Sequence, residues 1–234
     1  MPNPLASRYP GRFIILGKDR DAYAAIYGAT GRSPASLARK FVREADAVFM
    51  TAADETVSRE KNPELFEYPA LKIFGNGIAV ANGRQIENIT RLESREAKKQ
   101  LSYALSEEAY EPDEYKTPRI TGIIVENRNV VEAALHIARY APDGIDRSAW
   151  NIALESGIGA FISTYRGDDA KPAPSFFGSP APVPLSFGSA ENAARTVFDS
   201  FAPPPGAPDY RVGVVAAYLS PGQTPDIAIV NKIS

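Results

Sequence analysis

The stretch ALKIFGNGIAVA, residues 70–81, decides how this sequence folds. Two short apolar arms flank a Gly-Asn-Gly turn at residues 75–77. Asn-Gly between apolar runs is the strongest short-range signal for a β-hairpin, because both residues accept the positive φ angles of a tight turn. A second Asn-Gly, Asn82 and Gly83, follows the second arm directly. The stretch therefore predicts two antiparallel strands, with polar residues where the second strand ends.

Further apolar and aromatic runs of strand length lie on both sides of this hairpin. We predict strands at residues 12–17, 22–30, 46–52, 119–125, 130–140, 159–167, 210–219 and 226–231. The run at 130–140 also fits a helical period, but the short ENRN connection before it favours a hairpin with 119–125. Helical periodicity predicts helices at 91–108 and at 189–202, the second with Ser189 as its N-cap.

Strands, helix, strands, helix and strands follow one another along the 234 residues. This order predicts an α+β fold in which antiparallel sheets are covered by a few helices. We expect a single domain over residues 1–234 with a proline-rich segment at 171–188, where five of eighteen residues are proline. That segment is either an irregular surface excursion or a lid or oligomer contact, since Phe176, Phe177 and Phe187 are large side chains to leave in water.

The chain contains no cysteine and a single histidine, His136. Thiol nucleophiles, thiolate zinc sites, iron–sulfur clusters and multi-histidine metal centres are therefore excluded. A Ser–His–Asp triad would have to use His136, but its neighbours are apolar and the nucleophile-elbow glycine pattern is missing, so we expect a structural histidine. Chemistry has to come from carboxylates, tyrosines, arginines, lysines, hydroxyls and backbone amides. We expect neither a metal nor an organic cofactor.

Charge and hydropathy limit the partners of this chain. The formal net charge is −2, which gives no general attraction to nucleic acid or to an anionic membrane. No apolar run approaches the roughly 20 residues that span a bilayer, and the first residues lack the apolar stretch of a signal peptide. We expect a cytoplasmic protein that binds a small molecule, without a nucleic-acid or membrane partner. The sequence leaves a homo-oligomer open.

Three polar clusters stand at predicted strand ends. Arg32 and Ser33 offer donors that suit a phosphate or carboxylate, and Arg39 would follow about two turns later if this segment is helical. Tyr68 directly precedes the hairpin stretch, and YEPDEY at residues 110–115 gathers three acids before the strand at 119. Each cluster also has a purely structural interpretation: a solvated helix start, an aromatic at a sheet edge, and a solvated helix exit. Burial beside an arginine would instead tune an acid for proton transfer.

Four motifs carry a family resemblance: YPGRFIILGK, GRSPAS with ARKF, NPELFEYPALKIFGNGIAVANGRQIENI and YEPDEYKTPRITGIIV. In this order they resemble the archaeal-type IMP cyclohydrolase family and its bacterial relatives, over roughly the first 125 residues. The resemblance implies a four-layer αββα sandwich with antiparallel sheets, like that of N-terminal-nucleophile hydrolases but without their processed nucleophile. The implied reaction closes 5-formamidoimidazole-4-carboxamide ribotide to IMP with loss of water, in de novo purine biosynthesis.

The resemblance also implies which residues act. Tyr68 matches the family's active-site tyrosine, Glu111 its catalytic glutamate, and Arg32 the first arginine of an Arg-Ser motif. The resemblance also points to residues for substrate binding, including two arginines that could replace a positive charge missing from this chain: Ser33, Arg39, Asn82, Gly83, Arg84, Glu114, Tyr115, Thr117 and Arg119. The reaction takes a proton from a carboxamide nitrogen and gives protons to a formyl oxygen, which carboxylate, phenol and guanidinium groups can do without a metal.

The chain departs from the family at Leu37, where relatives usually carry a second arginine. We predict that Arg39 or Arg84 supplies this charge in the pocket of the three catalytic residues. The alternative is a non-catalytic or repurposed relative that binds a purine-ribotide-like ligand. A third interpretation, a glycoside hydrolase that uses Glu111 and a second acid, is disfavoured because Trp150 is the single tryptophan and sugar clefts usually present more aromatic platforms.

Overall fold

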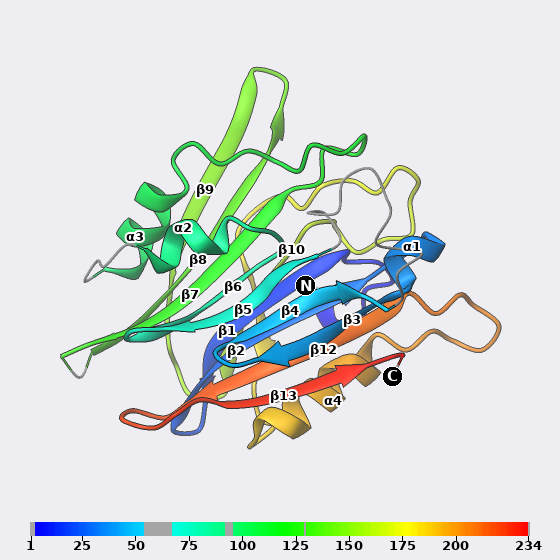
Figure 1. Cartoon of the computed structure of the whole chain (residues 1–234). Helices are drawn as coiled ribbons and strands as arrows, with labels where there is room; N and C mark the ends of the chain where they lie inside the picture. Colours follow the sequence, from blue (N-terminus) through cyan, green and yellow to red (C-terminus); the bar gives the residue numbers. More distant parts are fainter. Residues whose placement is uncertain (1–2, 54–66, 92–95, 129, 234) are drawn as a thin grey trace.

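The computed structural model describes residues 3–53, 67–91, 96–128 and 130–233, which form two sheets (Figure 1). The six-stranded sheet consists, in order, of β11 (Ala181–Pro184), β10 (Ile158–Ser163), β1 (Arg12–Asp19), β2 (Ala22–Thr30), β12 (Arg211–Leu219) and β13 (Asp226–Asn231). The seven-stranded sheet consists, in order, of β3 (Arg39–Glu44), β4 (Ala47–Ala52), β5 (Tyr68–Phe74), β6 (Gly77–Ala81), β7 (Arg119–Asn127), β8 (Val130–Ala141) and β9 (Gly144–Ile152). Neighbouring strands in both sheets pair antiparallel, which confirms the predicted α+β class with antiparallel sheets.

The predicted hairpin forms the centre of the seven-stranded sheet. Leu71 of β5 pairs with Val80 of β6, and Ala81 of β6 pairs with Thr121 of β7. Because these strands alternate in direction, the start of β5 at Tyr68, the end of β6 and the start of β7 lie at one end of the sheet. The polar residues predicted at these three strand ends, Tyr68, Asn82 and Arg119, therefore lie at the same end of the sheet.

Apolar side chains pack between the two sheets and on the outer face of each sheet. The inner faces meet in one core, to which β2 contributes Tyr27 and β7 contributes Ile124. The outer face of the six-stranded sheet is covered by α4 (Ala190–Ser200). The outer face of the seven-stranded sheet is covered by α2 (Ile86–Thr90) and α3 (Ala97–Ala104), on the far side of the molecule from α4 (Figure 1).

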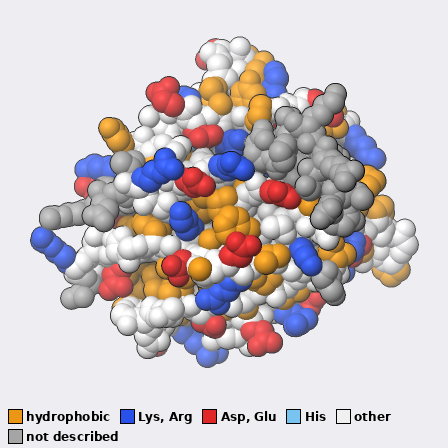
Figure 2. Space-filling view, viewed as in Figure 1, with side chains coloured by type: hydrophobic (Ala, Val, Ile, Leu, Met, Phe, Trp, Pro, Cys, Tyr) orange, Lys and Arg blue, Asp and Glu red, His pale blue; other side chains and the backbone are white. Residues whose placement is uncertain are grey.

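The surface mixes charges of both signs. On the face seen in Figure 2, acidic and basic side chains are interspersed with small apolar patches. Within the described part of the chain, no helix has both the length and the apolar character needed to cross a bilayer.

The segment after β2 is not a two-turn helix. It forms a single turn, α1 (Pro34–Leu37), capped by Ser33, whose hydroxyl accepts from the Ser36 N–H at 3.1 Å. The chain then enters β3 at Arg39, which sequence patterns did not predict. Asn231 at the end of β13 holds this strand, because its side-chain oxygen accepts from the Phe41 N–H at 2.8 Å.

Other boundaries also differ from the prediction. Of the helix predicted at 91–108, residues 92–95 lie outside the described residues, and α3 ends at Ala104, so the prediction is wrong for residues 105–108, of which 105–107 form a turn. The strand β9 was not predicted, because polar and charged residues interrupt its apolar ones. Within the proline-rich segment, β11 adds an edge strand to β10. The cap of α4 is confirmed, since the Ser189 hydroxyl accepts from the Asn192 N–H at 3.2 Å.

His136 is buried in β8 opposite Thr121, at 3% exposure, as expected for a structural histidine. Burial, and repulsion from Arg147, lower the pKa of His136 from 6.5 to about 4. The unfolded chain takes up this proton near pH 6.5, whereas the folded chain resists it down to about pH 4. The free energy of unfolding should therefore fall as the pH is lowered through this window, by up to about 3 kcal/mol.

Urea unfolding of wild-type protein and His136→Gln, at about pH 7 and about pH 4.5, measures this contribution. We expect the wild type to lose more stability than the variant on acidification. Equal losses would contradict the assignment to His136.

Candidate active site

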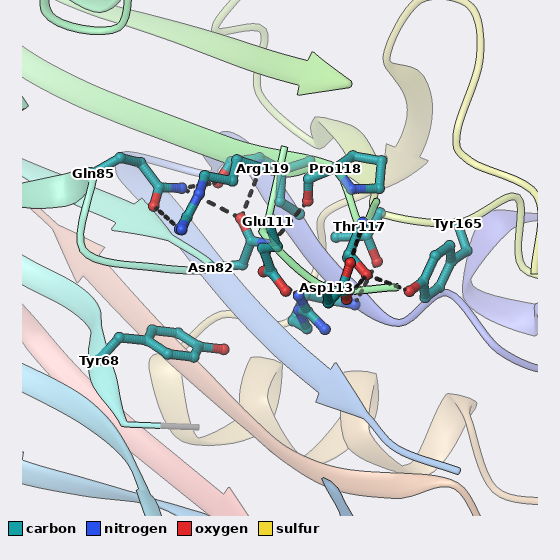
Figure 3. Close-up of polar contacts among 12 residues, drawn as sticks. Tyr68, Asn82, Gln85, Glu111, Asp113, Thr117, Pro118, Arg119 and Tyr165 are labelled. Carbon is teal, nitrogen blue, oxygen red and sulfur yellow. Dashed lines mark hydrogen bonds and ion pairs between the residues drawn. The ribbon is translucent and has the colours of Figure 1, made fainter. Parts of the chain in front are cut away.

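A tight turn over residues 111–117, the Glu111 loop, precedes β7. The Glu111 N–H donates to the Thr117 carbonyl at 2.8 Å, which closes the loop. Asp113 accepts from the Thr117 N–H at 2.8 Å and from its hydroxyl at 2.5 Å. The Thr117 hydroxyl also lies 2.7 Å from the hydroxyl of Tyr165, just beyond β10 (Figure 3). Of the clustered acids, Asp113 shapes the loop and Glu111 is the one that the loop buries.

The Glu111 carboxylate is held by two side chains from different strands. Glu111 is 3% exposed and forms an ion pair with Arg12, the first residue of β1. Asn82, just after β6, donates to the same carboxylate oxygen at 2.8 Å and to the Pro118 carbonyl at 2.9 Å. Its side-chain oxygen accepts from the Ile120 N–H at 2.7 Å, which fixes the orientation of the amide.

Burial sets the protonation behaviour of Glu111. It raises the pKa of Glu111 above its usual 4.5, against the charge of Arg12 and the hydrogen bond from it. A raised pKa at a buried carboxyl suits proton transfer near neutral pH.

The side chain of Arg119 makes further polar contacts next to the predicted Asn82-Gly83 pair. The Arg119 guanidinium donates to the Gln85 side-chain oxygen at 2.9 Å and pairs with Glu108 at 3.0 Å. It crosses the backbone of Gly83 so closely that a Cβ there would lie 1.9 Å from it. A side chain at position 83 would displace the Arg119 guanidinium from this place, so the glycine makes room for its contact with Gln85, and the second Asn-Gly serves this site rather than a hairpin.

Two tyrosines meet across the space between the sheets. Tyr68 is 2% exposed, and its hydroxyl lies 2.8 Å from the hydroxyl of Tyr27 on β2. Arg39, which is also 2% exposed, interacts electrostatically with both phenols and with Glu111. Burial lowers the pKa of Arg39, an effect that Tyr68 opposes and the positive charge of Arg12 reinforces.

Arg12 joins the carboxylate to the phenols. Burial alone would lower its pKa, but Glu111 and then Tyr68 act in the opposite direction, and the pKa of Arg12 stands well above its usual value. Arg12 and Arg39 thus place two buried guanidinium groups near the Glu111 carboxylate.

Arg32 lies at the edge of this group and contacts the segment after β10. Its guanidinium donates to the Ala170 carbonyl at 2.7 Å and pairs with Asp169 at 2.7 Å. It also stacks on the Tyr9 ring, 3.8 Å from its centroid. Tyr9 in turn stacks on Tyr165 at 5.5 Å, so aromatic rings connect Arg32 to the Glu111 loop.

The structure gathers some of the predicted site residues and separates others. Around Glu111 lie Tyr68, Arg39, Asn82, Gly83, Thr117 and Arg119. Ser33, Arg84, Glu114 and Tyr115 are exposed. Leu37 is partly buried and packs against the core between the sheets, to which Tyr27 and Tyr68 also belong.

Sequence reasoning assigned no role to Arg12, Tyr27, Gln85 or Tyr165. Arg12 stands inside the motif YPGRFIILGK, but its acidic partner is 99 residues away in the chain. Tyr27 looks like an ordinary core aromatic in an apolar strand, and only the pairing of the two sheets reveals its hydroxyl contact.

Two other features of the described residues lie outside this group. A cavity of about 360 Å³ is lined by the β5–β6 turn, the end of β7 and the β12–β13 turn, at the opposite end of these strands from Tyr68. Among the described residues, no group of three or more His, Cys, Asp or Glu side chains is placed to hold a metal ion.

Comparison with known proteins shows a consistent similarity. Residues 9–217 match the family model described as IMP cyclohydrolase-like protein. A protein of Methanocaldococcus jannaschii named IMP cyclohydrolase is 29% identical over 159 residues, which cover 67% of this chain and 73% of that protein. Proteins of the same name from Methanopyrus kandleri and Thermococcus kodakarensis are 38% identical over 119 residues and 32% over 118 residues. These two matches cover 48% and 50% of this chain, and 57% and 56% of the two relatives.

Proposed function

The chain belongs to the IMP cyclohydrolase-like protein family, and from that premise we propose that it closes 5-formamidoimidazole-4-carboxamide ribotide to IMP. The carboxamide nitrogen bonds to the formyl carbon and loses one proton, the formamide nitrogen loses a second proton as its double bond to this carbon forms, and the formyl oxygen leaves with both protons as water. The chain is thus a cyclohydrolase, a hydrolase of a cyclic amidine C–N bond that runs in the ring-closing direction. It works in the cytoplasm without a cofactor.

The observation that carries this proposal is the buried group of Glu111, Arg12 and Tyr68. Both reacting atoms belong to one substrate molecule, so the protein mainly has to hold the formyl group in its reactive rotamer and move protons. Glu111, with its raised pKa, takes the proton from the carboxamide nitrogen. Tyr68 donates to the formyl oxygen as negative charge develops on it.

The arginines of the site suit an anionic ribotide. The substrate phosphate carries about −2 charges, and the guanidinium groups of Arg12 and Arg39 both lie near Glu111. Arg12 Nε is buried and has no acceptor among the described residues, which supports an oxygen of the ligand at that place. Arg32 adds a third cation at the edge of the group, where a substrate phosphate would compete with Asp169.

We also propose the finer architecture that goes with this function. Helices on both outer faces of the paired sheets support a four-layer αββα sandwich of the N-terminal-nucleophile-hydrolase type. The chain is then one IMP cyclohydrolase-like domain over residues 1–234, with an insertion at 171–188.

Arg39, rather than Arg84, compensates for the leucine at position 37. Arg39 is buried beside Tyr68, whereas Arg84 is exposed. Arg39→Met keeps a similar volume and removes the charge, so we expect kcat/KM to fall about 100-fold. Arg84→Met should lower it less than about threefold, and Leu37→Arg should lower stability because the leucine packs against the core.

Steady-state kinetics of the three variants, with circular dichroism as a check of folding, measures these effects. If Arg39→Met retained full kcat/KM and Leu37→Arg raised it more than about tenfold, compensation by Arg39 would be wrong.

The alternative function, a relative that binds a purine ribotide without turnover, makes a different prediction for one pair of measurements. Wild-type protein is incubated with the formamido ribotide in buffer with EDTA, and IMP formation is followed by absorbance. Calorimetric titration with IMP is run in parallel. Turnover supports the cyclohydrolase, whereas binding of IMP without turnover supports the repurposed relative.

A further inference from the structure

The hydroxyl contact between Tyr27 and Tyr68 joins the two sheets at the active-site end. Tyr27 belongs to β2 at the centre of the six-stranded sheet, and Tyr68 opens β5 in the other sheet. Their oxygens are 2.8 Å apart, and either hydroxyl has the geometry to donate. Which of them donates decides what Tyr68 can offer to a ligand.

The surroundings hold the Tyr27 ring rigidly. Tyr27 is 0% exposed, and its neighbours in the sheet are Ile14 of β1 and Val215 of β12. Phe41 meets the ring edge-on, with centroids 5.8 Å apart and planes at 80°. A ring fixed from three strands keeps its hydroxyl in one place and serves as a firm anchor for Tyr68.

Once a ligand accepts the Tyr68 proton, the direction of the hydrogen bond between the two phenols follows from the acceptors left for the Tyr27 proton. Each phenol has one proton to donate. Burial raises the pKa of Tyr27 well above its usual value, so it keeps its proton. Among the described residues, Tyr68 is the hydrogen-bond partner of the Tyr27 hydroxyl. If Tyr68 donated to Tyr27, the buried Tyr27 proton would have no acceptor within the described part of the chain, which costs about 1–3 kcal/mol.

We propose that Tyr27 is a positioning residue, which donates to Tyr68 and thereby leaves the Tyr68 proton for the formyl oxygen of the substrate. This assignment rests on the proposed cyclohydrolase function and extends it to a residue that does not touch the substrate. As charge grows on the formyl oxygen, the Tyr68 bond to it strengthens and polarises the bond from Tyr27 in the same direction. Tyr27 therefore stabilises the transition state rather than the bound substrate, and it does so only through Tyr68.

A double-mutant cycle with Tyr27→Phe and Tyr68→Phe tests this dependence, since phenylalanine keeps the packing and removes one hydroxyl. Tyr68→Phe alone should lower kcat about 100-fold. Tyr27→Phe alone should lower kcat about tenfold and change KM less than about twofold. In the Tyr68→Phe background, Tyr27→Phe should change kcat less than about twofold.

Tyr218→Phe is the matched control for loss of a buried phenol hydroxyl. Tyr218 is 6% exposed, and its hydroxyl donates to Asp19 at 2.8 Å, at the end of β1 away from Arg12. Asp19 stands seven positions after Arg12 along β1, which corresponds to about 23 Å. We expect Tyr218→Phe to cost a similar amount of stability in urea unfolding and to leave kcat unchanged.

The outcomes separate this assignment from the proposed function. If the wild type forms no IMP, the cyclohydrolase function fails and the assignment fails with it. If the wild type forms IMP but Tyr27→Phe keeps full kcat, or lowers it equally in both backgrounds, the function stands and the positioning role of Tyr27 is wrong.

Discussion

Replacement of Glu111 by glutamine is expected to lower kcat for IMP formation by about 100- to 10,000-fold. Glutamine keeps the shape and the contact with Asn82, but it cannot take the proton from the carboxamide nitrogen. The Arg12 charge then stays buried without its acidic partner, so some stability is lost as well. Activity has to be measured at a temperature where circular dichroism shows both proteins folded.

The pH profile gives a second readout of Glu111. Its carboxyl must be ionised to act as a base, so kcat/KM falls as the pH is lowered and the group is protonated. Because burial raises the pKa of Glu111, this acidic limb should lie above 4.5, the usual value for a glutamate. Glu107→Gln, at an exposed acid four residues earlier, is the control and should keep wild-type activity. Full activity of Glu111→Gln would rule out this glutamate as the base.

Replacement of Arg12 by methionine is expected to lower the free energy of unfolding by about 3–5 kcal/mol. The side chains of Arg12 and Glu111 are only 12% and 4% exposed, so the remaining carboxylate would be buried without its counter-charge. The result should be seen in urea unfolding at neutral pH, where the carboxyl would otherwise be ionised. Activity should fall too, because Arg12 also interacts with Tyr68.

The double variant Arg12→Met with Glu111→Gln separates the ion pair from simple packing. With both charges removed, most of the lost stability should return, because neither partner is left as a buried charge. A double variant that is no more stable than Arg12→Met alone would mean that the arginine stabilises the fold through its packing.

Local sequence signals predicted the parts of the fold that depend on neighbouring residues. In the β5–β6 turn only Gly75 has a positive φ, and Ser189 caps α4 through a residue three positions away. By contrast, β3 follows a helical turn and becomes a strand because β4 pairs with it and Asn231, 190 residues further on, binds Phe41. No local pattern contains that information.

The site residues likewise fall into those that the sequence identified and those that only the packing of the sheets reveals. Family motifs pointed to Tyr68 and Glu111 because the motif residues are contiguous in the chain. Their partners Tyr27 and Arg12 are 41 and 99 residues away, in the other sheet. Those contacts exist only once the two sheets pack face to face, and for this reason the sequence identified the acid and the phenol but not the groups that hold them.

A single-turnover experiment tests the proposed chemistry most directly. Metal-free wild-type protein, in excess over the formamido ribotide, is mixed in EDTA buffer, and IMP is followed by absorbance and identified by chromatography. We expect the ribotide to be converted completely to IMP, at least about 100-fold faster than in protein-free buffer and about 100-fold or more faster than with Glu111→Gln. Conversion no faster than in buffer, by a protein that circular dichroism shows to be folded, would contradict the cyclohydrolase function.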